Sequence, residues 1–122
     1  MRQNLKRRKG LTDMTVTELA AKCGFDLIAA PSPERVVNGV YIGDLLSWVM
    51  GRAREDNAWI TIMSNVNVIA VATLADVSCV VFAEGVSPEQ DIIDLARDKG
   101  INLIRSGLPA YETALKISGV QQ

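Results

Sequence analysis

The sequence contains no histidine, and this absence excludes a large class of chemistry. Histidine is the usual base beside a serine or cysteine nucleophile, the common proton carrier at neutral pH, and a frequent metal ligand. The only two cysteines, Cys23 and Cys79, are too few and too far apart for a disulfide framework or a zinc site. We expect both to be reduced thiols in the core.

Long hydrophobic runs are also absent. No stretch approaches the roughly 18 uninterrupted apolar residues of a transmembrane helix. The basic start of the chain is not followed by the apolar segment of a signal peptide. We therefore expect a cytoplasmic protein that does not associate with membranes. The phosphate-binding pattern G-x-x-x-x-G-K-[ST] and the dinucleotide pattern G-x-G-x-x-G are missing as well.

The composition that remains is that of an ordinary globular domain. The chain has 122 residues, of which 48% are hydrophobic and 22% charged. A domain of this size buries roughly two thirds of its unfolded surface, which is enough for a core. We expect residues 14–120 to form that single domain.

The net charge of −1 hides an uneven distribution. Five of the thirteen basic residues lie between Arg2 and Lys9, so the chain from Met14 onward carries eight basic and thirteen acidic residues. An acidic body argues against a nucleic acid partner, because phosphate contacts depend on clustered Lys and Arg. Residues 1–13 are polar, lack apolar periodicity, and are predicted to form a disordered basic tail.

The basic tail has a second interpretation. The sequence KRRKG at residues 6–10 can be encoded entirely by purine-rich codons, as if a ribosome-binding site had been translated, and Met14 follows a few codons later. We hypothesise that Met14 is the functional start, with a start at Met1 as the alternative. The mass of the native protein distinguishes the two.

Alternating strand and helix signals predict an α/β domain with a mainly parallel sheet of about five strands flanked by helices. Asn38-Gly39 predicts a bulge or tight turn within the second strand. Residues 66–75 fit a helix or a buried strand by periodicity, and we choose a helix because parallel strands need a crossover. Strands are expected at 25–30, 36–42, 58–63, 77–83 and 101–104, and helices at 15–23, 45–50, 66–75, 88–99 and after Pro109.

Helix boundaries are marked by capping residues. Thr15 and Glu18 form a capping-box pattern for the first helix. Asp44 is expected to cap the second helix. Ser87 is expected to cap the helix that Pro88 opens.

Small polar residues cluster in the turns that follow the predicted strands. In open α/β sheets, ligands bind beyond the carboxyl ends of the strands, where helix N-termini favour anions. The sequence therefore predicts a site for a phosphate or carboxylate at these turns, with helix capping alone as the alternative reading. The candidate ligand-binding residues are Gly43, Asp44, Ser64, Asn65, Asn67, Glu84, Gly85, Ser106 and Gly107.

No catalytic constellation stands out beside this candidate site. Asp44 and Glu84 would form a carboxylate pair, suited to a metal or to acid–base work, if their strands were adjacent. Helix capping explains Asp44 equally well. We predict a protein that is not an enzyme, with no catalytic residues, no metal and no cofactor.

The helix after Asp44 carries five apolar side chains among residues 45–50, which cover more than one face. One face is expected to pack on the sheet, and packing within the core alone is one interpretation. The other is a homodimer contact, because Trp and Met are favoured at interfaces. The candidate interface residues are Leu45, Trp48 and Val49.

The order of elements and the turns at Gly43-Asp44, at residues 64–67 and at residues 83–88 resemble those of a DRTGG domain over residues 14–120. That module lies between CBS domains in some pyrophosphatases and occurs in some phosphotransacetylases. It is also similar to the N-terminal domain of the HPr serine kinase. The chain departs from the family pattern in having Asn65 and Asn67 where relatives place an acid and an arginine. It also has Ala83-Glu84-Gly85 where Thr-Gly-Gly is usual.

The resemblance implies a regulatory, dimer-forming module. It does not imply kinase activity, because the kinase domain and its phosphate-binding loop are absent. We expect a stand-alone, non-catalytic regulatory domain that senses a small anionic or nucleotide ligand at the strand ends, with a protein partner in a regulatory pathway. The alternatives are a pure interaction or dimerisation module without a ligand, or a small carboxylate-based enzyme.

Overall fold

The fold is described from a computed structural model, which places residues 14–121. The predicted basic tail at 1–13 lies outside the described residues, and the domain boundary at 14–120 stays a prediction. None of the described helices is long and apolar enough to span a membrane.

A five-stranded sheet forms the centre of the domain, with strand order β2-β7-β6-β5-β4. The four strands from β4 to β7 are parallel, and β2 pairs antiparallel with β7. The prediction of a mainly parallel α/β sheet is confirmed. The strands are β2 (Asp26–Ala29), β4 (Val40–Ile42), β5 (Ala58–Thr61), β6 (Cys79–Phe82) and β7 (Asn102–Arg105).

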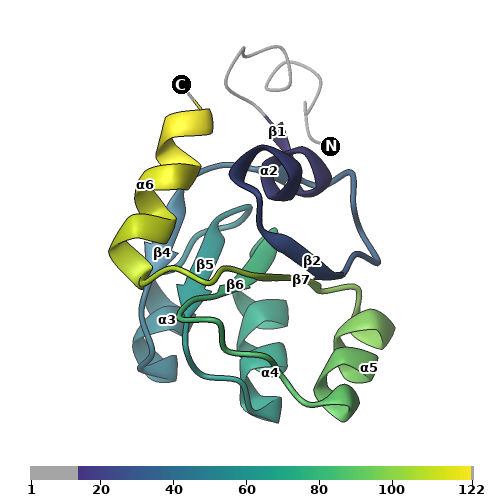
Figure 1. Ribbon diagram of the computed structural model, residues 1–122. Coiled ribbons are helices and arrows are strands. Elements are labelled where there is room, and N and C mark those ends of the chain that lie inside the picture. Colours follow the sequence, from purple (N-terminus) through teal and green to yellow (C-terminus); the bar gives the residue numbers. More distant parts are fainter. Residues whose placement is uncertain (1–13, 122) are drawn as a thin grey trace, which may run out of the picture.

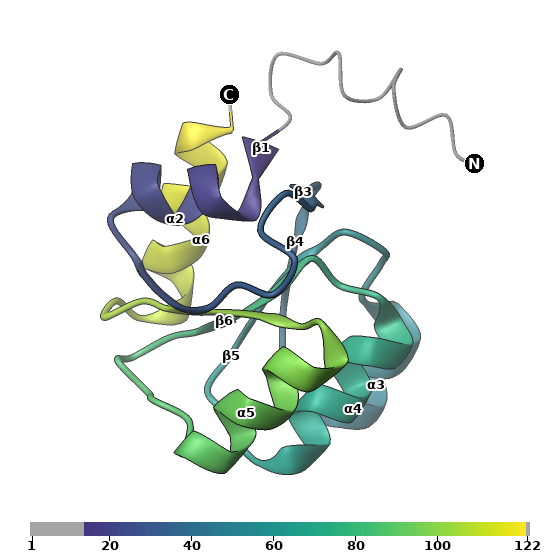
Figure 2. The same ribbon diagram turned by 90° about the vertical axis from the view of Figure 1, so that its right-hand side faces the viewer.

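Helices cover both faces of this sheet (Figure 1). On one face lie α3 (Leu46–Arg52), α4 (Val66–Ala75) and α5 (Gln90–Lys99); on the other lie α2 (Val16–Cys23) and α6 (Ala110–Val120). Figure 2 shows these two layers from the side. Residues 66–75 are thus a helix, as chosen, and it connects the parallel strands β5 and β6.

The two layers bury separate hydrophobic clusters. Trp59, Val80 and Leu103 face the layer of α3, α4 and α5, and Ile60, Val81 and Ile104 face α2 and α6. All residues of β5 and β6 are buried, because helices pack on both faces of these two strands. The Trp59 indole N–H donates to the Gly43 carbonyl at 2.8 Å, so this buried ring leaves its polar atom paired.

The predicted second strand is broken in two. Its first part, β3 (Val36–Val37), pairs antiparallel with β1 (Met14–Thr15) in a small separate sheet, and its second part is β4. Gly39 lies at the break with φ +85°, and an added Cβ there would lie 2.9 Å from Asn57 Nδ2. The turn signal at Asn38-Gly39 was correct, but it separates two sheets.

The first capping prediction is confirmed and the other two are wrong. Thr15 Oγ1 accepts from the Glu18 amide at 3.2 Å, and Glu18 Oε1 accepts from the Thr15 amide at 2.9 Å. Asp44 does not cap α3, whose N-cap is Leu45 without a side-chain bond. Helix α5 begins at Gln90, so Ser87 lies outside it.

Both cysteines are free and buried, as expected. Burial raises the pKa of the Cys79 thiol to about 12 and raises the pKa of Cys23 above its ordinary value. Both thiols are therefore protonated at neutral pH and are poor nucleophiles.

We predict that Cys79 makes the folded state sensitive to alkaline pH. The unfolded thiol ionises near its ordinary pKa of 9.0 and the folded thiol near 12. The contribution of this thiol to the free energy of unfolding is therefore fully present below pH 9. It is lost as the pH rises toward 12, by at most about 1.4 kcal/mol per pH unit. Denaturant unfolding from pH 8 to 11 should show a steeper loss for the wild type than for Cys79→Ala. Parallel curves for the two proteins would contradict this origin.

Candidate functional site

The carboxyl ends of β4, β5, β6 and β7 lie along one edge of the domain, because these four strands are parallel. The predicted turns therefore follow one another in space. The turn after β7 neighbours the turn after β6, the turn after β6 neighbours the turn after β5, and the turn after β5 neighbours the turn after β4. Whether these turns bind a ligand stays a prediction, and their hydrogen bonds show what each residue does in the fold.

Asp44 braces the end of β5. Its Oδ1 accepts from Thr61 Oγ1 at 2.7 Å and from the Ile62 amide at 2.9 Å. Thr61 is buried, so the carboxylate satisfies a hydroxyl that has little contact with water. Asp44 is thus a structural acceptor between two adjacent turns.

The possible carboxylate pair of Asp44 and Glu84 required adjacent strands, and the strand order does not provide them. Strand β5 lies between β4 and β6, so the two residues follow strands that are about 10 Å apart at the usual strand spacing. The described residues also contain no cluster of three His, Cys, Asp or Glu side chains suited to a metal.

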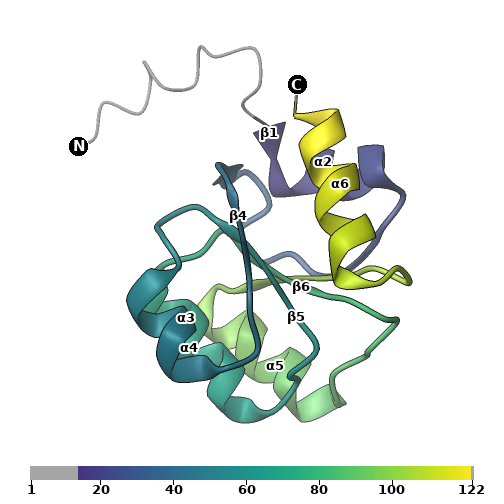
Figure 3. The same ribbon diagram turned by 90° about the vertical axis from the view of Figure 1, so that its left-hand side faces the viewer.

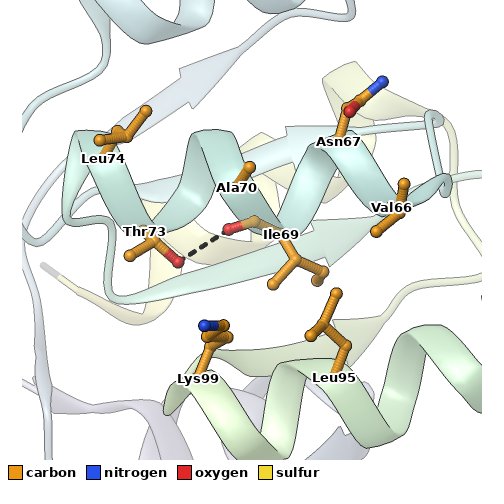
Figure 4. Close-up of a pocket in the computed structure, with 8 residues that line it drawn as sticks. All are labelled: Val66, Asn67, Ile69, Ala70, Thr73, Leu74, Leu95 and Lys99. Carbon is orange, nitrogen blue, oxygen red and sulfur yellow. Dashed lines mark hydrogen bonds between the residues drawn. The ribbon is translucent and has the colours of Figure 1, made fainter.

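The turn after β5 mainly serves helix α4. Asn65 is its N-cap, and its side chain accepts from the Asn67 amide at 2.9 Å. Ser64 is half-buried, whereas Asn65 and Asn67 are exposed. Figure 4 shows the Asn67 side chain directed away from α5. Capping accounts for Asn65, and the Asn67 amide group remains at the surface.

The turn after β6 has an unusual backbone. Glu84 has φ 60°, a left-handed conformation that costs a residue with a side chain about 1 to 2 kcal/mol. Two bonds hold this turn to the next one: the Glu84 amide donates to the Leu108 carbonyl and the Gly85 amide to the Ser106 carbonyl, each at 2.8 Å. The Glu84 side chain itself is exposed.

The turn after β7 contains one buried and one exposed candidate residue. Ser106 is fully buried, with its hydroxyl 2.8 Å from that of Thr113 and accepting from the Leu108 amide at 3.1 Å. It is therefore not accessible to a ligand. Gly107 is exposed, and an added Cβ would meet nothing within 4 Å.

Sequence reasoning missed Arg105, the last residue of β7. Its guanidinium contacts Asp26 Oδ2 at 2.7 Å and donates to Ser87 Oγ at 2.7 Å. It is a half-exposed cation at the predicted edge, bonded to Ser87 in the segment after β6 and two residues before Gly107. A basic residue at the carboxyl end of a buried strand was the available signal.

Two hollows border this region. One is a groove of about 330 Å³ between α4 and α5, where Ile69 and Leu95 face each other (Figure 4). Thr73 donates its hydroxyl to the Ile69 carbonyl at 2.8 Å, so it brings no free donor to the groove. The other, of about 360 Å³, is lined by Cys23, Gly24, Phe25, Gly107, Leu108 and Lys116.

The three candidate interface residues separate into two kinds. Leu45 is 58% exposed and Trp48 is 52% exposed, whereas Val49 is fully buried in the core. Val49 is therefore unavailable to a partner, and its place in the candidate interface is corrected. Arg52 lies over the Trp48 ring at 3.8 Å, a cation–π contact at the surface.

The arrangement of five strands and their turns has known relatives. The profile of the DRTGG domain matches residues 18–120, which is most of the chain. This chain belongs to the DRTGG domain family. None of the curated proteins matches it.

One solved structure similar to this DRTGG domain is the crystal structure of the CBS and DRTGG domains of the regulatory region of Clostridium perfringens pyrophosphatase, complexed with its activator diadenosine tetraphosphate. The TM-score is 0.70 at 16% sequence identity, so the likeness shows a shared fold. The match covers 84% of this chain and 45% of that chain. The likeness to the HPr serine kinase stays a prediction.

We predict that Asp44 contributes to stability. Asp44→Ala leaves the buried Thr61 hydroxyl without its acceptor, which should cost about 1 to 3 kcal/mol of unfolding free energy. Asp44→Asn keeps an oxygen at the same place and should lose less. Urea unfolding of both variants measures the difference, and an Asp44→Ala protein as stable as the wild type would contradict the role.

Proposed function

We propose that this DRTGG domain is a non-catalytic regulatory module that senses a small anionic ligand, of the nucleotide class, at the carboxyl ends of β6 and β7. The observation that carries the proposal is Arg105, a half-exposed cation held at this edge, bonded to Ser87 in the segment after β6 and two residues before Gly107. The nucleotide activator of the neighbouring pyrophosphatase regulatory region supports the choice of ligand class.

Competition with Asp26 makes this site suitable for a reversible sensor. The Asp26 and Arg105 side chains are 64% and 40% exposed, and exposed ion pairs contribute only about 0 to 1 kcal/mol. A phosphate with two oxygens in the guanidinium plane forms a stronger, bidentate contact. An incoming phosphate can therefore replace Asp26 at little cost, while Ser87 supplies a neighbouring hydroxyl.

Several of the predicted site residues at the carboxyl edge are less suited to contact a ligand. Asp44 is engaged by Thr61 and Ile62, and Ser106 is buried. Gly85 and Gly107 are exposed and lie in the turns that follow β6 and β7, the turns nearest Arg105 in the strand order of the sheet, so we restrict the proposed site to the β6–β7 half. Asp44 and Ser106 brace their turns and Asn65 caps α4, whereas the side chains of Asn67 and Glu84 are exposed.

We predict that the ligand raises the melting temperature through Arg105. A ligand at one hundred times its dissociation constant stabilises the native state by about 2.7 kcal/mol. A thermal-shift panel of ATP, diadenosine tetraphosphate and inorganic phosphate should give a shift of several degrees with at least one compound. Arg105→Ala should abolish the shift, and Arg105→Lys should keep part of it.

Arg97→Ala is the matched control for this experiment. Arg97 is an exposed arginine on α5, in contact with Asp94 at 3.9 Å, and within the described residues it makes no bond to Arg105 or Ser87. Its removal changes the net charge as Arg105→Ala does and should leave the shift intact. A flat response of the wild type across the panel would refute ligand sensing.

The second candidate function is a pure interaction module, in which the domain acts through a homodimer. The exposed Leu45 and Trp48 favour it, because large apolar side chains at the surface mark protein contacts. Dimerisation and ligand sensing are compatible, and a dimer without any ligand response would favour the pure interaction module.

We predict that Trp48→Glu weakens the homodimer by at least about tenfold, because it places a charge in the apolar contact. Light scattering across a dilution series measures the dissociation constant. Leu27→Glu serves as the control, because Leu27 lies on β2, the edge strand opposite β4, and it should leave the dissociation constant of the dimer unchanged. A wild type that is monomeric at every concentration would contradict dimerisation.

A further inference from the structure

The two edges of the five-stranded sheet are built differently. The β2 edge carries a β-bulge and the charged pair of Asp26 and Arg105 at 2.7 Å. Arg97 Nη2 donates to the Ile28 carbonyl at 3.4 Å, and Pro31 follows the strand. Bulges, charges and prolines are the devices that keep an edge strand from pairing with another chain. The β2 edge is protected.

The β4 edge has open backbone groups. The Gly39 carbonyl accepts from the Ala58 amide at 2.9 Å, and the Gly43 amide donates to the Ile60 carbonyl at 3.1 Å. Because alternate residues of a parallel strand bond to the same neighbour, Val40 and Ile42 turn their amides and carbonyls away from β5. Within residues 14–121, β4 pairs with β5 alone.

The segment that forms the β4 edge and enters α3 contains few charged residues, and Arg52 at the end of α3 lies over the Trp48 ring. Between Val40 and Gly51 the sequence contains one charged residue, Asp44, which is bonded to β5 and the turn after it. Ile42 is 47% exposed, in line with the exposure of Leu45 and Trp48. An open edge whose strand carries no charged residue is a template for pairing with another strand.

We propose that β4 pairs antiparallel with β4 of a second copy of this chain, joining the two five-stranded sheets into one continuous sheet. This inference deepens the proposed homodimer and rests on it. With a two-fold axis at Tyr41, Val40 lies opposite Ile42 of the second copy. Each such pair exchanges both of its N–H···O bonds, so every open group of Val40 and Ile42 finds a partner.

The symmetry also brings the apolar helices together. A two-fold axis perpendicular to the sheet keeps each face on its own side, so α3 of one copy approaches α3 of the other. Figure 3 views this edge, with β4 in front of β5, α3 on one side and α6 on the other. The exposed Leu45 and Trp48 belong to the segment that enters and forms α3. Strand pairing and helix contact thus form one interface.

Self-pairing is favoured over an extended peptide from another protein by the neighbouring helix. A second copy brings its own exposed Leu45 and Trp48 to the contact, and an extended peptide brings no such helix. An isologous contact of this kind closes after two copies and does not propagate into fibres. It explains how an unprotected edge is kept soluble.

Amide hydrogen exchange tests the proposal directly. In the monomer the amides of Val40 and Ile42 face solvent, whereas Tyr41 is bonded to β5. Between dilute and concentrated samples, exchange at residues 40 and 42 should slow by at least about tenfold, and exchange at Tyr41 should change less. A dimer in which residues 40 and 42 exchange freely at all concentrations would overturn the strand pairing and leave the homodimer intact.

Substitution gives an independent measure. Ile42→Lys places a charge on the pairing strand and should raise the dimer dissociation constant by at least about tenfold. Leu27→Lys is the matched control, since Leu27 is 38% exposed on the opposite edge strand, and it should leave the dissociation constant unchanged. Circular dichroism confirms that both variants fold. An Ile42→Lys dimer as tight as the wild type would overturn the proposal, and a wild-type monomer would overturn the homodimer as well.

Discussion

Burial of β5 and β6 on both faces is the constraint on which the rest of the domain depends. Apolar strands of this kind need helices on each side, and the parallel order of β4 to β7 requires helical crossovers. The crossovers supply α3, α4 and α5 on one face, and α2 and α6 complete the other. Each turn at the carboxyl edge connects a strand to the helix that follows it.

Several polar residues in the turns at the carboxyl edge have structural roles in the fold. Asp44 satisfies a buried hydroxyl, Asn65 caps α4, and Ser106 is enclosed with Thr113. Each is the type of residue that a binding site also needs, because caps and ligands both require small donors and acceptors. The open positions are those whose neighbours leave space, and Arg105 gives them a charge.

The contrast between the two sheet edges follows from their neighbours. β2 is antiparallel to β7, and charged side chains and Arg97 surround it. β4 is joined to α3 by a short turn whose one charged residue, Asp44, is bonded to β5 and the turn after it, and the turn contains no proline. An open sheet has two edge strands. Here side chains surround the β2 edge, whereas the β4 edge exposes unpaired backbone N–H and C=O groups.

Composition and periodicity alone determined the fold class, the buried thiols and the absence of histidine chemistry, because these depend on residue types and local spacing. The family resemblance, on short turn motifs, also came from sequence. Sequence did not reveal that Asn38-Gly39 separates two sheets, since both halves have strand-like residues. It assigned Asp44 and Ser87 as caps because capping residues look alike before their partners are known.

Tertiary structure decided which residues are available. Strand order separated Asp44 from Glu84, packing placed Val49 in the core while leaving Trp48 at the surface, and the antiparallel neighbour brought Asp26 to Arg105. Exposure and pairing are set by segments far apart in the chain, such as residues 26 and 105. Local sequence patterns determine what an element is, and only the assembled sheet determines what its side chains and its edges can meet.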